Sequence, residues 1–249
     1  FRGAAAVGNT VVFAPMYALA VGVFTLPAPS PSPSPPPSPP PPSPPEPTFT
    51  TVSISINGFG EDKFRGAAAV GDKVVFTPSH ADVVGVFDVG ANTFTTFSHG
   101  QEMPSTFYSV AAAGNKAIFA PARASAVGIL TLSAPAASSP PPPLPPPPPP
   151  LLPPPPPIAP PPIAPRPVAP PPSPTFTTVP TGMSGPSKFD GAATVGDKVV
   201  FAPRNADVVG VFDVSTNTFD ASVFTGALTG YLAACNGIAC SGKFFAAVV

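Results

Sequence analysis

The sequence is poor in the side chains that carry most enzyme chemistry. It has no tryptophan, only two histidines and two cysteines, and charged residues make up 9% of it. His80 and His99 are too few for a histidine-rich metal site, and no Ser-His-Asp arrangement can be built from them. No glycine motif for binding phosphates or dinucleotides is present. We therefore expect no catalytic residue, no cofactor and no metal, and we expect the protein not to be an enzyme.

Low charge and short apolar runs exclude two classes of partner. The net charge is −1, and the chain has neither a basic stripe nor an acidic tail. Nucleic acid is therefore not an expected partner. No apolar run reaches the ~18 residues that a membrane helix needs, so we predict no membrane span.

The two cysteines, Cys235 and Cys240, stand in the segment CNGIAC. No further cysteine or nearby histidine completes a zinc site. Two interpretations stay open, a local disulfide in a secreted protein and two incidental thiols. The chain begins and ends within repeated or apolar sequence, so we expect it to be a piece of a longer protein, in which a leader segment would be missing.

What the sequence does have is one segment repeated four times. The clearest copies are residues 64–97 and 189–219, and shorter copies are residues 1–15 and 107–121. A repeat of this length is a signature of the fold. The step from Phe64 to Phe107 falls within the ~40–50 residues typical of propeller repeats.

Within the clearest copy, turn residues separate four short runs of small, β-branched and aromatic residues. Gly71 followed by Asp72 predicts a two-residue type II′ hairpin turn. Pro78 predicts the end of the second strand, because proline cannot donate to a ladder. Most phenylalanines are predicted to lie in the core. The predicted strands are 66–70, 73–76, 83–87 and 93–97. Four short antiparallel strands in every repeat predict an all-β fold, a β-propeller with one blade for each repeat.

The order of these features resembles the kelch repeat of β-propellers. Val70-Gly71-Asp72-Lys73 stands where kelch repeats have their first hairpin. Phe87-Asp88 followed by Asn92-Thr93-Phe94 resembles their later hydrophobic-Asp and Thr-Asn-Thr-Trp segments. The chain departs from the pattern where Thr77-Pro78 replaces paired glycines and where Phe94 replaces tryptophan. The resemblance is to a divergent kelch-like protein. It implies a partial β-propeller of about four four-stranded blades, and no particular function.

Two proline-rich segments interrupt the first and third copies at the same point. They contain most of the 46 prolines and follow Thr25-Leu26 and Thr131-Leu132, where the intact copies have Asp-Val. Proline runs favour the extended polyproline II conformation. Because neighbouring strands lie only ~5 Å apart, each segment must leave its blade and return. The alternatives are an outer strand that is detached or supplied by a neighbour, and a gene-model artefact.

The copies and the two segments divide the chain into six pieces. These are the inner strands of the first blade (1–26), the first proline-rich insert (27–47), the end of the first blade with the second blade and the start of the third (48–133), the second insert (134–174), the end of the third blade with the fourth (175–230), and the truncated start of a further blade (231–249).

The two proline-rich segments resemble different protein classes. The first, SPSPSPPPSPPPPSPP, resembles the Ser-Pro repeats of plant and green-algal hydroxyproline-rich wall glycoproteins such as extensins and pherophorins. That resemblance implies hydroxylated, glycosylated prolines and an extracellular or cell-wall location. The second, PPPPLPPPPPPLLPPPPP, resembles the profilin-binding tracts of actin regulators, which implies the cytoplasm. A solvated low-complexity linker is the third interpretation of both segments.

The site hypothesis rests on one loop of each intact copy. Propellers place recognition residues in loops, and the loop between the second and third strands differs between copies. The candidate binding residues are His80, Asp82, Arg204, Asn205 and Asp207. The recurrent Asp72, Asp88, Asp197 and Asp213 are interpreted as turn formers rather than metal ligands.

These patterns favour a non-enzymatic propeller module that binds a protein or a glycan in an extracellular or cell-wall setting. Two alternatives remain. One is a fragment of a larger propeller enzyme whose catalytic residues are missing. The other is a cytosolic scaffold with profilin-binding polyproline. An incomplete ring of blades would leave open edges, which also predict self-association.

Overall fold

The computed structural model describes residues 2–27, 46–54, 56, 62–100, 106–133 and 173–224. Cys235 and Cys240, the predicted further blade and most of both proline-rich segments lie outside these residues. The described part of the chain forms strands and no helix, so it offers no helix that could cross a membrane. The predicted all-β class is confirmed.

The described strands all belong to one compact unit, made of Phe1–Leu132 and Pro174–Val249. They are β1 (Ala4–Val7), β2 (Thr10–Phe13), β3 (Ala20–Thr25), β4 (Thr48–Ser53), β5 (Phe64–Val70), β6 (Lys73–Pro78), β7 (Val83–Asp88), β8 (Thr93–Ser98), β9 (Phe107–Ala113), β10 (Lys116–Pro121), β11 (Ala126–Thr131), β12 (Thr175–Pro180), β13 (Phe189–Val195), β14 (Lys198–Pro203), β15 (Val208–Asp213) and β16 (Thr218–Phe224).

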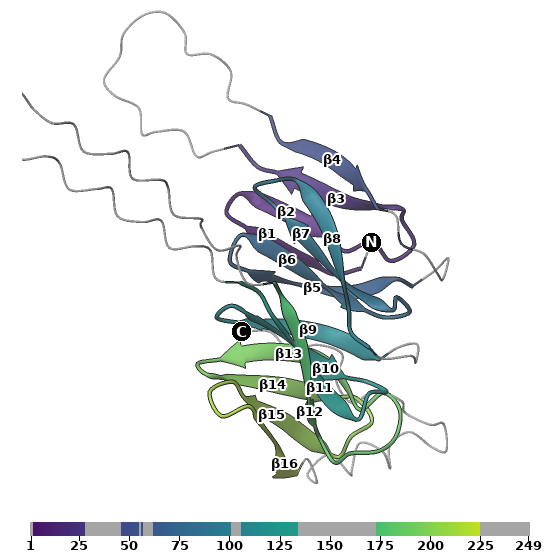
Figure 1. Ribbon diagram of the computed structural model, residues 1–249, viewed down its shortest axis with the longest axis vertical. Coiled ribbons are helices and arrows are strands. Elements are labelled where there is room, and N and C mark those ends of the chain that lie inside the picture. Colours follow the sequence, from purple (N-terminus) through teal and green to yellow (C-terminus); the bar gives the residue numbers. More distant parts are fainter. Residues whose placement is uncertain are drawn as a thin grey trace, which may run out of the picture. The chain divides into compact units, whose positions relative to one another are not determined.

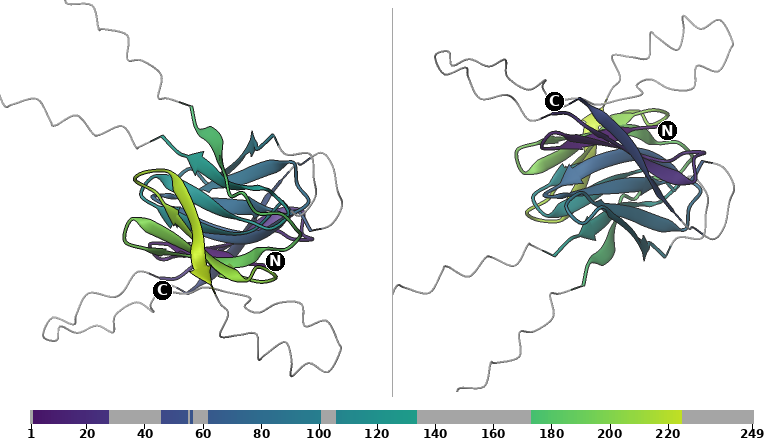
Figure 2. Two further views of the ribbon diagram at one scale, coloured as in Figure 1. Left: turned by 90° about the horizontal axis from the view of Figure 1, so that it is seen from below. Right: turned by 90° about the horizontal axis from the view of Figure 1, so that it is seen from above.

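Each repeat folds into one four-stranded antiparallel sheet (Figure 1). The first sheet is β1–β4, the second β5–β8, the third β9–β12 and the fourth β13–β16. Strands that follow one another in the sequence are neighbours in every sheet, as the colours in both views of Figure 2 also show. The repeat is therefore the structural unit, as its sequence predicts.

The strands on either side of each proline-rich segment pair with each other. β3 pairs with β4, with Thr25 opposite Thr48. β11 pairs with β12, with Thr131 opposite Thr175. The outer strand of each interrupted sheet is thus neither detached nor supplied by a neighbour. Both segments connect the third strand of a sheet to its fourth.

The first hairpin of every sheet has glycine at the first turn position. Val70 pairs with Lys73 across Gly71 and Asp72. Gly71 has φ +62°, whereas Asp72 is not among the residues with positive φ, which matches the predicted type II′ pattern. The corresponding glycines have nearly the same φ: Gly8 +58°, Gly114 +60° and Gly196 +60°.

The prediction that the second strand ends at Phe76 was wrong. β6 continues to Pro78, and the same extension to proline occurs in β10 and β14. Phe64 pairs with Pro78, but the register shifts between Phe64 and Ala67. Proline is tolerated in a sheet where the ladder is irregular, because its missing N–H costs least there.

Phenylalanines form a compact aromatic group on each of the last three sheets. In the third sheet, ring centroids of Phe107, Phe119 and Phe176 lie 5.5–6.3 Å apart. A Cβ placed at Gly128 would lie 2.8 Å from Phe107 Cζ and 2.9 Å from Phe176 Cζ. Glycine on the third strand therefore makes room for the rings. The predicted burial is confirmed for Phe64, Phe76, Phe87, Phe107, Phe119, Phe189, Phe201 and Phe212, which are all fully buried.

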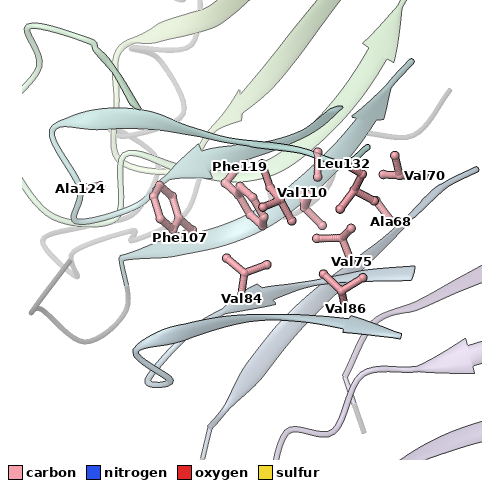
Figure 3. Packing of buried hydrophobic residues seen from close by; sticks show 12 residues of the cluster. Ala68, Val70, Val75, Val84, Val86, Phe107, Val110, Phe119, Ala124 and Leu132 are labelled. Carbon is pink, nitrogen blue, oxygen red and sulfur yellow. The ribbon is translucent and has the colours of Figure 1, made fainter. Parts of the chain in front are cut away.

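Successive sheets pack through one recurring pattern, with branched aliphatic side chains of one sheet against aromatic side chains of the next. Between the second and third sheets, Val75, Val84 and Val86 face Phe107 and Phe119 (Figure 3). Val12, Val21 and Val23 pack in the same way with Phe64, Phe76 and Phe87, and Ile118, Val127 and Ile129 with Phe189, Phe201 and Phe212. Burial of each such side chain contributes about 1.5–3 kcal/mol.

Candidate binding site

The candidate site is built from one position of the repeat, the residue after its first phenylalanine. This residue is Arg2, Arg65, Tyr108 and Asp190 in the four copies. The residues around it are similar in the copies, as in FRGAAAV and FDGAATV. β5 lies against both β1 and β9, and β9 lies against β13. The repeats thus differ at this position, and the fold places the strands that carry it next to one another.

Two arginines flank the ring of Tyr108. The Arg65 guanidinium carbon lies 4.3 Å from the ring centroid, and that of Arg204 lies 5.4 Å from it. Arg204 Nη1 also pairs with Asp190 Oδ2 at 3.3 Å. Tyr108 Oη lies 3.3 Å from Ser187 Oγ, within hydrogen-bond distance. We refer to Arg2, Arg65, Tyr108, Asp190 and Arg204 as the arginine–tyrosine cluster.

The cluster has an excess of positive charge. Burial raises the pKa of Asp190 above its ordinary value, and the charges of Arg204, Arg65 and Arg2 oppose that rise. The Asp190 side chain is only 9% exposed. Three arginines, of the five in the whole chain, therefore act on one desolvated carboxyl group, Arg204 by direct contact and Arg65 and Arg2 through their charge. Few charged residues are present elsewhere in the sequence, so this concentration is distinctive.

Arg65 is the member of the cluster that contacts the Tyr108 ring and makes no side-chain hydrogen bond or ion pair within the described residues. Its Nε is buried and has no hydrogen-bond partner. Within the described part of the chain its guanidinium makes no side-chain hydrogen bond or ion pair, and its one described contact is the stacking on Tyr108. Guanidinium N–H groups present a planar fork that matches the two oxygens of a carboxylate. The Arg65 guanidinium therefore keeps donors that no described side chain uses.

The sequence-predicted site residues lie in the loops of two different sheets. His80 and Asp82 lie in the β6–β7 loop, where His80 Nδ1 is 3.4 Å from Ser79 Oγ and Asp82 is exposed. Arg204, Asn205 and Asp207 lie in the β14–β15 loop, with Asn205 Nδ2 donating to Pro186 O at 3.3 Å. Of the five, Arg204 takes part in the arginine–tyrosine cluster.

The backbone of these loops joins the strands of the fold. Ser79 N donates to Lys63 O at 2.9 Å, and Arg204 N donates to Lys188 O at 2.8 Å. Lys188 in turn links this loop to the third sheet, because its Nζ donates to Ala122 O, just after β10, at 3.0 Å. Desolvation lowers the pKa of this buried lysine. The loops therefore have a structural role that their sequence does not indicate.

Two of the four recurrent aspartates, Asp88 and Asp213, accept hydrogen bonds that close turns. Asp88 Oδ1 accepts a hydrogen bond from Ala91 N at 2.8 Å, and Asp213 Oδ1 accepts one from Thr216 N at 3.1 Å. The carboxylates of Asp88 and Asp213 also pair with Lys73 and Lys198. These lysines are the largest cause of the lowered pKa of each aspartate.

Sequence reasoning missed Arg2, Arg65, Tyr108 and Asp190. A signal was present, because the position after the first phenylalanine varies in charge between otherwise similar copies. The part of the chain that the structure describes contains no group of three or more His, Cys, Asp or Glu side chains able to hold a metal ion.

Comparison with known proteins adds no family. No family model matches the chain, and no curated protein matches it. The protein is an all-β protein of repeated four-stranded sheets that contains the arginine–tyrosine cluster.

Proposed function

We propose that the protein is a non-enzymatic binding module, built as a partial, kelch-like β-propeller whose blades are the four sheets. Three observations support this architecture. Each repeat forms its own antiparallel sheet. The first strands β1, β5, β9 and β13 lie next to one another in chain order. Successive sheets pack face to face through the same aliphatic and aromatic positions, as the blades of a propeller do.

The arginine–tyrosine cluster is the observation that carries the binding function. Repeat proteins keep the framework positions and vary the positions that meet a ligand. Here the variable position supplies Arg2, Arg65, Tyr108 and Asp190, and three of these are tied together through Tyr108 and Arg204. Arginine and tyrosine are also the residues that dominate the energetics of protein interfaces. The partner is a protein or a glycan.

We place the protein in an extracellular or cell-wall setting. The support is the Ser-Pro pattern of the first proline-rich segment, with its resemblance to wall glycoproteins. Both segments connect the third and fourth strands of alternate sheets, so an intact scaffold carries them at equivalent positions. Amino-acid analysis of the native protein tests the setting. Glycosylated hydroxyproline is expected, and unmodified proline on a cytosolic chain would contradict it.

A binding screen tests the function itself. The full chain is immobilised and exposed to a peptide library and a glycan array, beside the variants Tyr108→Ala and Arg204→Gln. Retention of a ligand by the wild type, with at least tenfold weaker retention by both variants (about 1.4 kcal/mol), is the expected result. The bound ligand should be recovered chemically unchanged. Equal retention by all three proteins would place binding elsewhere, and conversion of the ligand would show an enzyme.

A further inference from the structure

Arg65 is held in place without using its hydrogen-bonding capacity. The guanidinium carbon lies 4.3 Å from the Tyr108 ring centroid, which is a cation–π contact that holds the group against the ring. Its Nε is buried without a hydrogen-bond partner. A buried N–H donor without a partner is costly. The terminal Nη1 and Nη2 groups are not among the buried atoms and make no hydrogen bond or ion pair within the described residues, so they are the donors that a ligand acceptor can reach.

The acid within the cluster does not satisfy Arg65. The Asp190 carboxylate is engaged by Arg204, at 3.3 Å. Arg65 and Arg2 act on Asp190 only through their charge, since neither has a side-chain hydrogen bond or ion pair within the described residues. One negative charge is therefore shared among three positive ones, and two positive charges remain for a ligand. A negatively charged ligand would balance this excess of positive charge.

We propose that Arg65, supported by the charges of Arg2 and Arg204, binds a side-chain carboxylate of an acidic peptide. The inference rests on the proposed binding function and names its ligand. A carboxylate fits because its two oxygens match the fork of a guanidinium. A peptide is favoured over an acidic glycan. The Tyr108 ring, which could otherwise pack against a sugar ring, is already in contact with Arg65 and Arg204.

Hexaglutamate is the probe, with hexaglutamine as the neutral control peptide. Binding to the full chain is measured by calorimetry at low ionic strength, and then at higher salt, where it should weaken because the attraction is between charges. Hexaglutamine is expected not to bind. An oligogalacturonate of similar charge is the competing probe. Tighter Arg65-dependent binding of the oligogalacturonate than of hexaglutamate would overturn the choice of a peptide.

Three variants locate the binding. Arg65→Gln should weaken hexaglutamate binding about tenfold or more, the size expected for loss of charge-assisted hydrogen bonds. Arg65→Lys keeps the charge but loses the fork and is expected to fall between wild type and Arg65→Gln. Asp190→Asn removes the competing negative charge and should tighten binding. Circular dichroism and thermal unfolding check that each variant is folded. If Arg65→Gln does not fold, the more conservative Arg65→Lys is used in its place.

Arg123→Gln is the matched control, because it removes one positive charge from an exposed side chain outside the cluster. Its affinity should stay within about twofold of wild type, since an exposed charge is screened by solvent. Equal weakening by Arg123→Gln and Arg65→Gln would overturn the proposal in favour of diffuse attraction. If hexaglutamate fails to bind while the screen finds a Tyr108-dependent ligand, the inference fails and the proposed function stands. If neither assay finds a ligand, both fail.

Discussion

The side-chain amide of Asn115 donates to the backbone carbonyl of Leu132 at 2.9 Å. Leu132 also donates its N–H to Asn115 O at 2.9 Å, so the two residues are joined twice. Asn9 and Leu26 form the same pair in the first sheet, with an amide-to-carbonyl distance of 2.6 Å. Leu26 stands directly before the first proline-rich segment, and Leu132 stands one residue before the second. In the uninterrupted sheets the asparagine is replaced by Asp72 or Asp197, so this clamp belongs to the sheets that carry a segment.

Removing the clamp should destabilise an interrupted sheet more than an uninterrupted one. Asn115→Ala is expected to lower the free energy of unfolding by about 1 kcal/mol, the typical net contribution of one hydrogen bond. The matched control is Asp197→Ala, at the same hairpin position of the fourth sheet, where the side chain is exposed. Urea unfolding followed by circular dichroism gives both values. A loss for Asp197→Ala as large as that for Asn115→Ala would contradict the clamp.

Alanine at Gly128 should crowd the aromatic group of the third sheet. Its Cβ would meet Phe107 and Phe176 at 2.8 and 2.9 Å, and overpacking of this kind costs about 1–3 kcal/mol. Gly90→Ala is the control, since the nearest atom to its Cβ is Asp88 Oδ1 at 3.6 Å. The control should change stability by no more than ~0.5 kcal/mol. Midpoints of thermal unfolding distinguish the two variants, and similar midpoints would disprove the steric argument.

Burial of His99 should make the folded protein less stable in acid. Desolvation lowers the pKa of His99, although a hydrogen bond from its ring to Ala81 O and the charge of Asp82 oppose this. The unfolded chain takes up a proton near pH 6.5, whereas the folded chain resists it to lower pH. Stability is therefore present above pH ~6.5 and is lost as pH falls below that value.

Urea unfolding at pH 7.5 and pH 5.5 measures this loss. The wild type should be less stable at pH 5.5, and His99→Gln should reduce the difference between the two pH values. His80→Gln leaves His99 in place and is expected to keep the difference. A pH difference that is unchanged in His99→Gln would refute the assignment, whatever the absolute stability of the variant.

The first sheet should promote association of the chain with a second copy. Phe49 on β4 is 55% exposed, whereas its counterparts Phe94, Phe176 and Phe219 pack against buried clusters. Exposed aromatic area on a sheet favours pairing between molecules. Phe49→Ser should lower the association seen by light scattering. Val195→Ser, which removes an apolar side chain that is 58% exposed at the end of β13, should not. A wild type that is monomeric at every concentration would contradict the prediction.

Most of the fold could be predicted from the sequence because its signals are local. The first hairpin turn requires a positive φ, which Gly71 adopts readily. Turn residues between the apolar runs indicate four strands in each repeat. Thr25 and Thr131 mark the ends of the third strands, after which the proline-rich segments lead to the fourth strands. The end of the second strand was placed too early, since Pro78 lies at a register shift that depends on Phe64, a residue distant in sequence.

The candidate site could be predicted only in small part, because its contacts are not local. Arg204 was named as a loop residue, but its partners Tyr108 and Asp190 lie on the first strands of two sheets. No sequence pattern gives the distance between a loop and a neighbouring strand. His80 and Asp82 were chosen by analogy between copies, yet the backbone of their loop is occupied in joining strands. Variation between copies at the second repeat position is the sequence signal that points to the arginine–tyrosine cluster.

The pairing of Thr25 with Thr48, and of Thr131 with Thr175, makes the length of either connection nearly irrelevant to the sheet that bears it. Once the two ends are anchored side by side, doubling a flexible connection adds only ~0.6 kcal/mol to its closure. A guest peptide or domain with adjacent termini could therefore replace either connection. The protein would then serve as a display scaffold with two insertion points on alternate repeats.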